Sequence, residues 1–320
     1  MTCCCNATVA GLSWPLSTMA ARRQTEWHRQ VTDCVQHDEE GGHMDVLDTL
    51  RNAAIDVAKP PLSALLQPPQ AADKPLRLDV RWARHLDEVR QVQRLRHAVF
   101  AAEMGAVLQT PLAGHDIDAF DDFCEHLMVC DADKGVVIGT YRLLTPTQAL
   151  RAGGLYSDQE FDLAPLHAWR PRMVELGRSC VHASHRQGGV ILALWGALAE
   201  FMQRNQLDAM VGCASIPMQY PGLAHGEGPA RVWQQLRQTH LAEPELQVRP
   251  RVALPEELAS VSTSGMSVEP PALIQGYLRT GAKVLGAPAW DSDFNTADLP
   301  IMMRMQDLPS RYMRLFTRRG

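Results

Sequence analysis

The chain has 320 residues, of which 46% are hydrophobic and 21% charged, as is typical of a soluble globular protein with one large domain or two small ones. Its formal net charge of −5 excludes nucleic-acid binding through overall basic charge, so no nucleic-acid partner is expected. No run approaches the ~18 apolar residues of a spanning helix, so any membrane contact is expected to be peripheral or through a lipid substrate.

The cysteines indicate the redox compartment. There are 8 of them; three are adjacent, at positions 3–5, and the others are scattered without a Cys-x-x-Cys pair. No metal site is therefore predicted. Scattered cysteines in apolar segments usually act as small buried hydrophobic residues, which favours a reducing cytoplasm. The N-terminus has no basic region followed by an apolar stretch, so no secretory signal is predicted.

Residues 1–75 differ in composition from the rest of the chain. The cysteine triplet, a mixed polar run and the proline-rich Lys59-Pro60-Pro61 and Pro68-Pro69 predict a partly disordered extension and linker. Residues 45–57 have the spacing of a short amphipathic helix. The folded domain is predicted to span residues 76–320.

Hydrophobic periodicity predicts strands and helices throughout this domain. Residues 76–83 alternate like a strand, residues 87–103 have helical spacing, and residues 116–122 form an acidic loop. The same criteria predict further strands at residues 126–130, 136–144, 172–181, 209–215 and 299–305. They predict further helices at residues 189–204, 229–239 and 271–280. This alternation indicates one α/β domain with a mixed sheet.

A basic, glycine-containing turn joins the strand at 172–181 to the helix at 189–204. A strand, a tight turn and a helix start present backbone N–H groups to an anionic ligand. Arg186-Gln187-Gly188-Gly189-Val190-Ile191 resembles the Arg/Gln-x-x-Gly-x-Gly/Ala signature of GNAT acyltransferases, although Ile191 replaces its last small residue. The resemblance implies that Arg186, Gly188 and Gly189 hold the phosphate of a phosphopantetheine group; the alternative is an ordinary strand-to-helix turn.

Further blocks carry a more specific resemblance, and they lie at residues 95–106, 116–127, 139–144, 175–181, 212–215, 273–282 and 293–298. Over residues 76–318 their order and spacing resemble the bacterial ornithine lipid N-acyltransferases, a group with the GNAT fold. The front half is also similar to the acyl-homoserine lactone synthases, but Met104-Gly105-Ala106 stands where those enzymes carry a tryptophan. The motif pairs shared with the synthases are Arg96/Phe100, Asp118/Asp121, Gly139/Arg142 and Glu175/Arg178.

The resemblance implies an α/β GNAT fold, with a mixed, mostly antiparallel central sheet flanked by helices. It implies transfer of a 3-hydroxyacyl chain from acyl carrier protein, as a phosphopantetheine thioester, to the α-amine of L-ornithine. No permanently bound cofactor is implied. Two alternatives stay open: acylation of another amine, as in autoinducer synthesis, and a non-catalytic GNAT-like protein that binds acyl carrier protein or is associated with haemolysis.

Amide formation from a thioester needs a free amine, and an α-amino group is mostly ammonium near pH 7. Glu175 is the candidate base, directly or through a water. Alternatively it forms an ion pair with Arg178 or Arg142, which would lower its pKa and leave it to orient the substrate ammonium. The resemblance assigns catalysis to Glu175 and Arg178. It assigns stabilisation of the oxyanion to backbone N–H groups near Cys180 and Val181.

Arg142 and Arg178 lie on adjacent predicted strands and suit a substrate carboxylate, because a guanidinium offers two parallel N–H donors. The alternative is that they pair with Asp118, Asp121 or Glu175. Asp118 and Asp121 are candidates for the distal ammonium of ornithine or, alternatively, parts of a solvated loop. Asn295 and Asp298 fit either loop capping or substrate contact. The expected substrate-binding residues are Arg96, Phe100, Asp118, Asp121, Arg142 and Ser215.

Acyl carrier protein is strongly acidic, so it is expected to dock on basic residues, although a run of charges is usually a solvated face. The candidates are Arg186, Arg204, Arg279, Lys283, Arg311, Arg314, Arg318 and Arg319. We expect a cytoplasmic protein whose contact with the inner membrane is peripheral, through its lipid product.

Overall fold

The computed structural model describes residues 76–186, 189–255 and 268–312. These residues belong to one compact unit, Asp73–Gly320. The predicted extension over residues 1–75, including the helix expected at 45–57, lies outside them. Within the described part, no helix is both long and apolar enough to cross a membrane.

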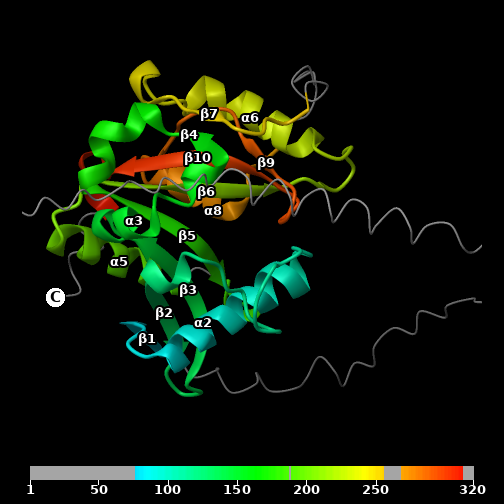
Figure 1. Ribbon diagram of the computed structural model, residues 1–320. Helices are drawn as coiled ribbons and strands as arrows, with labels where there is room; N and C mark the ends of the chain where they lie inside the picture. The colour runs from blue at the N-terminus through cyan, green and yellow to red at the C-terminus, as the bar shows by residue number, and fades with distance from the viewer. Residues whose placement is uncertain (1–75, 187–188, 256–267, 313–320) are drawn as a thin grey trace, which may run out of the picture. The chain divides into compact units, whose positions relative to one another are not determined.

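An eight-stranded sheet is the central layer of the described residues (Figure 1). Its order is β1 (Leu78–Trp82), β2 (Glu125–Asp131), β3 (Val136–Leu144), β5 (Met173–Val181), β6 (Ala209–Pro217), β10 (Thr296–Arg304) and β8 (Lys283–Val284), with β9 (Ala289–Asp291) also pairing with β10. β5 and β6 run parallel, whereas the other neighbours in this sheet are antiparallel. The predicted mixed, mostly antiparallel sheet is therefore confirmed.

The longer helices are α2 (Leu86–His97), α5 (Gly189–Arg204), α6 (Glu227–Thr239) and α8 (Ala272–Arg279). The helix predicted over residues 87–103 is correct only in its first part, because Ala98–Glu103 is a π-helix. π-helical turns are rare and occur mostly as short segments within or next to α-helices, so the helical spacing of apolar residues does not distinguish this turn from a continued α-helix.

Several elements are too short for periodicity to predict. They are α3 (Pro146–Ala152), α4 (Ser157–Glu160), and the pair β4 (Phe161–Asp162) and β7 (Arg249–Pro250), besides β8 and β9. Short 3-10 helices cover Asp121–Phe123, Ala164–Arg172, Ala183–His185, Pro244–Leu246 and Met305–Asp307.

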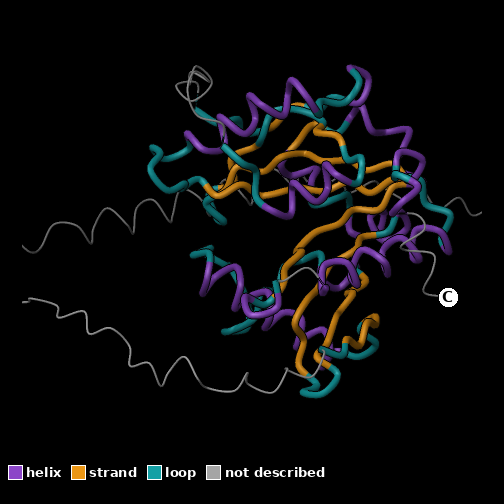
Figure 2. Tube along the Cα trace, turned by 180° about the vertical axis from the view of Figure 1, so that it is seen from behind, coloured by secondary structure: helices purple, strands orange, loops and turns teal. Residues whose placement is uncertain are grey.

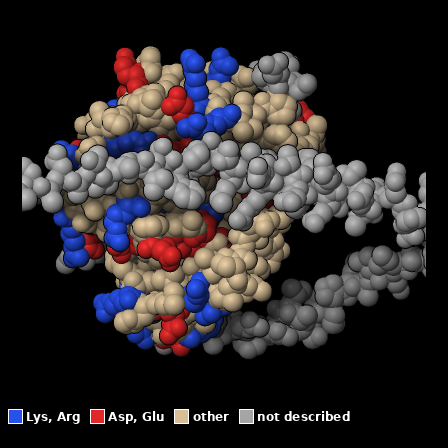
Figure 3. All heavy atoms as spheres, in the orientation of Figure 1, with Lys and Arg blue, Asp and Glu red and all other residues tan. Residues whose placement is uncertain are grey.

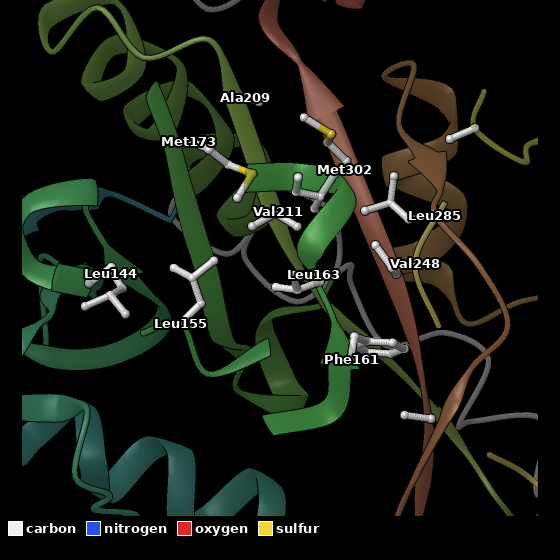
Figure 4. Close-up of a cluster of buried hydrophobic side chains, with 14 residues drawn as sticks. Leu144, Leu155, Phe161, Leu163, Met173, Ala209, Val211, Val248, Leu285 and Met302 are labelled. Atoms are coloured by element: carbon white, nitrogen blue, oxygen red, sulfur yellow. The ribbon is translucent and has the colours of Figure 1, made fainter. Parts of the chain in front are cut away.

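Helices cover both faces of the sheet because the side chains of a strand alternate between faces. On β2, Leu127 and Val129 pack in a cluster with α5, whereas Met128 and Cys130 pack against Val92 of α2. The view from behind shows the strands passing between these helices (Figure 2). Another cluster fills the space beside the middle strands, where side chains from β5, β6 and β10 meet those of the segment after α4 (Figure 4).

The parallel contact between β5 and β6 is short. The two strands pair at three positions only, Met173↔Ala209, Val174↔Met210 and Glu175↔Val211. They then diverge, although each continues. Gly212 lies at the point of divergence, where a Cβ would stand 2.3 Å from the carbonyl oxygen of Leu176. The strands approach so closely there that only glycine fits.

We expect Gly212→Ala to destabilise the fold by about 1–3 kcal/mol, because the added methyl group overlaps the backbone of Leu176 and has no flexible neighbour to displace. Chemical denaturation measures this. Gly177→Ala on β5 is the matched control, since the nearest atom there is 4.0 Å from the Cβ position. Equal effects of the two substitutions would contradict the close approach.

Candidate active site

A cavity of about 780 Å³ lies between β5 and β6, where the two strands no longer pair. Residues 176–181 of β5 line one side and residues 213–215 of β6 another. Further lining residues come from β3, the π-helix, the start of α5, α8, the segment at the start of α4, and β9 and β10 with the loop between them. A hollow with an apolar lining and a few charged groups is the usual form of a small-molecule site.

A buried arginine binds two aspartates beside this cavity. Arg96 on α2 is 0% exposed. Its Nε donates to Asp116 at 2.7 Å and its Nη1 to Asp121 at 2.8 Å, while Gln93 also donates to Asp121. Arg96 does not line the cavity, so its position fits support of these two aspartates better than contact with a substrate.

Two further arginines complete the network. Arg142 on β3 donates to Asp118 at 2.5 Å and to Asp121 at 3.0 Å. Arg178 on β5 donates to Asp116 at 3.1 Å and to Asp118 at 3.0 Å. Each of the three aspartates therefore joins two arginines, and the six side chains form a closed ring of alternating charge.

The charges of this ring hold its acidic members ionised. Burial acts to raise the pKa of Asp118, but Arg142 and Arg178 outweigh it, so this pKa lies below its ordinary value. The pKa of Asp121 is lowered in the same way, with Arg96 as the strongest opponent of burial. Three of the four aspartates in the predicted acidic loop, Asp116, Asp118 and Asp121, are thus paired with arginines in place of water, whereas Asp122 is exposed.

Arg178 has an unusual conformation and an aromatic environment. The β3–β5 register shifts between Thr140 and Arg142, so that Arg178 and Ser179 lie opposite Tyr141 in a β-bulge. Arg178 has a φ of 49°, in the left-handed region, which is unfavourable for a non-glycine residue. Its guanidinium carbon lies 5.1 Å from the ring centroid of Tyr156 and 4.8 Å from that of Phe294.

Glu175 lines the cavity at the last position where β5 pairs with β6. Its carboxylate accepts hydrogen bonds from the backbone N–H groups of Tyr156 and Ser157, both at 2.7 Å, and from the Ser157 hydroxyl at 2.5 Å. No arginine of the described residues forms a salt bridge with it, so the alternative ion pair is not formed. Burial raises the pKa of Glu175, against the lowering effect of these hydrogen bonds.

The cysteines in the cavity wall are poor nucleophiles. Burial raises the pKa of Cys180 to about 12, and it also raises the pKa of Cys213 well above its ordinary value. A thiol attacks as its thiolate, so neither side chain is suited to covalent catalysis. Both positions agree with the expected packing role of the scattered cysteines.

The predicted phosphate turn leads into α5 beside the cavity. Arg186 lines the cavity and pairs through both Nη atoms with Glu103 of the π-helix, while its Nε donates to the carbonyl oxygen of Val181 at 3.0 Å. Gly189 is the first residue of α5. Gly188 lies outside the described residues, so its predicted contact with phosphate stays a prediction.

A second group of carboxylates faces the cavity from β9 and β10. Asp298 accepts from the Thr296 hydroxyl at 2.8 Å and also bonds with Ser215. Burial, followed by the charge of Asp291, raises the pKa of Asp298 to about 6. Asp291 lines the cavity and is 8% exposed, and no Lys or Arg of the described residues forms a salt bridge with either carboxylate. Unlike the carboxylates of the ring, these two are held by hydrogen bonds from backbone N–H groups and hydroxyl groups and not by salt bridges.

The structure brings most of the predicted site residues together. Those that line the cavity are Phe100, Arg142, Glu175, Arg178, Cys180, Val181, Arg186 and Ser215. Asp118 and Asp121 lie next to it within the ring. Tyr156, Ser157 and Asp291 were not predicted from the sequence, because the short helix α4 with its N-cap and the short strand β9, which carry them, have no periodic signal.

A family model described as an acetyltransferase (GNAT) domain matches residues 95–196. An L-ornithine N(alpha)-acyltransferase of Rhodobacter capsulatus is 36% identical to the chain over 265 residues, which cover 78% of this chain and 98% of the relative. One of Agrobacterium fabrum is 35% identical, over 74% of this chain and 84% of the relative. A solved CoA-dependent acyl-homoserine lactone synthase aligns with a TM-score of 0.43 at 17% identity, over 73% of this chain and 82% of the other.

We expect Arg96→Met to destabilise the protein by about 3–5 kcal/mol, because it leaves the buried carboxylates of Asp116 and Asp121 without one of their two cations. Thermal and urea unfolding measure the loss. Arg77→Met is the control, since the Arg77–Asp133 pair lies at the surface and such pairs contribute little. A stability close to that of the unsubstituted protein would show that the ring does not depend on Arg96.

Proposed function

The chain belongs to the family of L-ornithine N(alpha)-acyltransferases, and we propose that it transfers a 3-hydroxyacyl chain from acyl carrier protein to the α-amine of L-ornithine. The product would be lyso-ornithine lipid, the first intermediate of ornithine lipid synthesis. The observation that carries the choice of amine is the pair of carboxylates, Asp291 and Asp298, that lines the cavity and forms no salt bridge with a Lys or Arg of the described residues. It favours a cationic amino acid over a neutral one.

Ornithine carries two ammonium groups and one carboxylate near pH 7. We assign its distal ammonium to Asp298 and Asp291, which line the cavity and form no salt bridge with a Lys or Arg of the described residues. From the sequence, this role was expected for Asp118 and Asp121. Both are already held by arginines, however, and neither lines the cavity.

The α-carboxylate is assigned to Arg178, whose guanidinium lines the cavity. Arg142 also lines the cavity and, through Asp118, shares the same ring. An anion that approaches Arg178 would share it with Asp116 and Asp118, and the flanking rings of Tyr156 and Phe294 would keep the guanidinium plane in place. Holding both ends of the amino acid leaves its α-nitrogen as the group presented to the thioester.

Glu175 is assigned as the base that removes a proton from the α-ammonium, directly or through a water. Burial raises its pKa, which brings its basicity closer to that of the amine. The free amine then attacks the thioester carbon and the C–N bond forms. As the C–S bond breaks, the proton that the attacking nitrogen loses passes to the sulfur, and the carrier leaves as a thiol. Backbone N–H groups near Cys180 and Val181 are the proposed oxyanion donors.

The acyl donor is proposed to enter along the start of α5, with its phosphate at Arg186 and the N-terminal end of this helix. Basic side chains lie next to acidic ones on the face seen in Figure 3. Of the candidate docking residues, Arg186, Arg204, Arg279, Lys283 and Arg311 are described, whereas Arg314, Arg318 and Arg319 lie outside the described residues. A cytoplasmic location with peripheral contact with the inner membrane completes the proposal.

The test is an assay of purified protein with 3-hydroxyacyl carrier protein and a panel of ornithine, lysine, glutamine and S-adenosylmethionine, read by mass spectrometry. We expect product with ornithine and a fall in kcat of about 10²–10⁴-fold in Glu175→Gln, because general-base catalysis contributes this much. Glu125→Gln, an exposed glutamate on β2, is the matched control. Product with another amine, but not with ornithine, would refute the substrate assignment.

We expect the KM for ornithine to rise as the pH falls through about 6, because Asp298 then takes up a proton and loses its charge. Asp298→Asn should raise the KM at pH 8 by about 30-fold or more and flatten its dependence on pH, since removing one partner of a buried charge pair costs about 2 kcal/mol or more. Steady-state kinetics from pH 5 to pH 8 measure both effects. Asp122→Asn, at an exposed aspartate, is the control, and an unchanged pH dependence in Asp298→Asn would place the titrating group elsewhere.

A further inference from the structure

A smaller chamber of about 70 Å³ adjoins the main cavity. The two hollows share the lining residues Tyr141, Leu176, Trp195, Cys213, Ala214 and Tyr277. Beyond this common wall, the chamber is lined mostly by aliphatic side chains of α5, β6 and β10 and of the segment that follows β10. Its lining suits hydrocarbon, and a ligand must pass the shared residues to reach it from the main cavity.

Hydrogen-bonding groups are concentrated in this shared wall. The hydroxyl groups of Tyr141 and Tyr277 lie 2.5 Å apart, and the indole Nε1 of Trp195 donates to the Tyr141 hydroxyl at 3.3 Å. The Ser179 side chain, in the bulge of β5, bonds with both tyrosines. These residues come from β3, α8, α5 and β5, so four separate elements bring their polar atoms to one place.

The position of Trp195 is fixed by close packing. A Cβ on Gly276 would stand 2.5 Å from the Cη2 atom of Trp195, so the indole ring lies directly against α8. The ring centroids of Trp195 and Tyr277 are 5.9 Å apart. The hydrogen-bonding groups are therefore held by packing of the rings, and their geometry does not depend on a ligand.

Two features of this cluster point to a ligand with a hydroxyl group. Phenylalanine would fill the same wall without the cost of burying hydroxyl groups among apolar side chains. In addition, three hydroxyl groups and one indole N–H supply about four hydrogens against about six lone pairs. The cluster therefore has spare acceptor capacity after its internal bonds are made, and a ligand that donates one hydrogen bond would use it.

We propose that Tyr277 and Tyr141, supported by Ser179 and Trp195, bind a hydroxyl group close to the thioester end of the acyl chain and so select 3-hydroxyacyl donors over unsubstituted ones. The hydrocarbon beyond the hydroxyl group would enter the apolar chamber. The inference rests on the proposed function, since it concerns the donor of the same reaction, and it gives the hydroxyl preference of that donor a structural cause.

The test compares 3-hydroxyacyl and unsubstituted acyl carrier proteins of equal chain length, with ornithine as acceptor. For Tyr277→Phe we expect the kcat/KM for the 3-hydroxyacyl donor to fall about tenfold, because one buried hydrogen bond is lost. The kcat/KM for the donor without the hydroxyl group should stay close to the value for the protein without the substitution. Tyr220→Phe is the matched control, since Tyr220 lines neither hollow. Ser179→Ala, expected to act in the same direction, is the second variant in case Tyr277→Phe does not fold.

Three results would overturn the inference. If the unsubstituted protein uses both donors equally well, there is no selection to explain, although acylation of ornithine would still stand. If Tyr277→Phe slows both donors to the same degree, the hydroxyl pair acts on a step common to them. If calorimetric binding of 3-hydroxyacyl and acyl pantetheine amides, measured without an amine, shows no difference that depends on Tyr277, the hydroxyl group is not bound there. Absence of product with ornithine from either donor would instead refute the proposed function itself.

Discussion

The short parallel contact between β5 and β6 is the constraint on which the rest of the molecule depends. The strands pair at three positions and then separate. Gly212 lies in close contact with the backbone of Leu176 at this point, and each strand continues beside its other neighbour, β3 for β5 and β10 for β6. Past that point, the facing edges of two long strands no longer bond with each other. The resulting hollow is lined by Glu175, by the bulge of Arg178 on one side and by Asp298 on the other. Within the described part of the chain, divergence of the backbone creates the site.

The charged groups around this hollow fall into two kinds. In the ring of three arginines and three aspartates, each charge has partners of the opposite sign, so the desolvation of each is compensated. The ring links α2, the loop after it, β3 and β5, and it connects the only positive-φ residue of the described β5 to a buried support. Asp291 and Asp298 have no such compensation, and the raised pKa of Asp298 reflects the cost. Structure and recognition are thus assigned to different carboxylates, which sequence alone does not separate.

Much of the fold could be predicted because long elements repeat their pattern. The helix at residues 189–204 and the strand at 136–144 have the predicted bounds. The π-helical turn, the bulge at Arg178 and the short α4 were not predictable, since each depends on tertiary contacts rather than on local spacing. The site shows the same division. Motif spacing identified Glu175, Arg142 and Arg178. The salt bridges of Asp118 and Asp121 with arginines, which place them in the ring, are visible only in the structure. Likewise, only the fold brings Tyr156, Ser157 and Asp291 to the cavity.

The stacking of Arg178 between Tyr156 and Phe294 has a consequence for the mechanics of the sheet. Arg178 belongs to β5, whereas Phe294 belongs to the loop that precedes β10, so the stack spans the opening between the two separated arms of the sheet. Cation–π contacts contribute about 0.5–2 kcal/mol each, less than a row of strand hydrogen bonds would. The link that these rings form across the opening is therefore weaker than the strand pairing on either side of it, and the backbone pairing of the two arms does not depend on it.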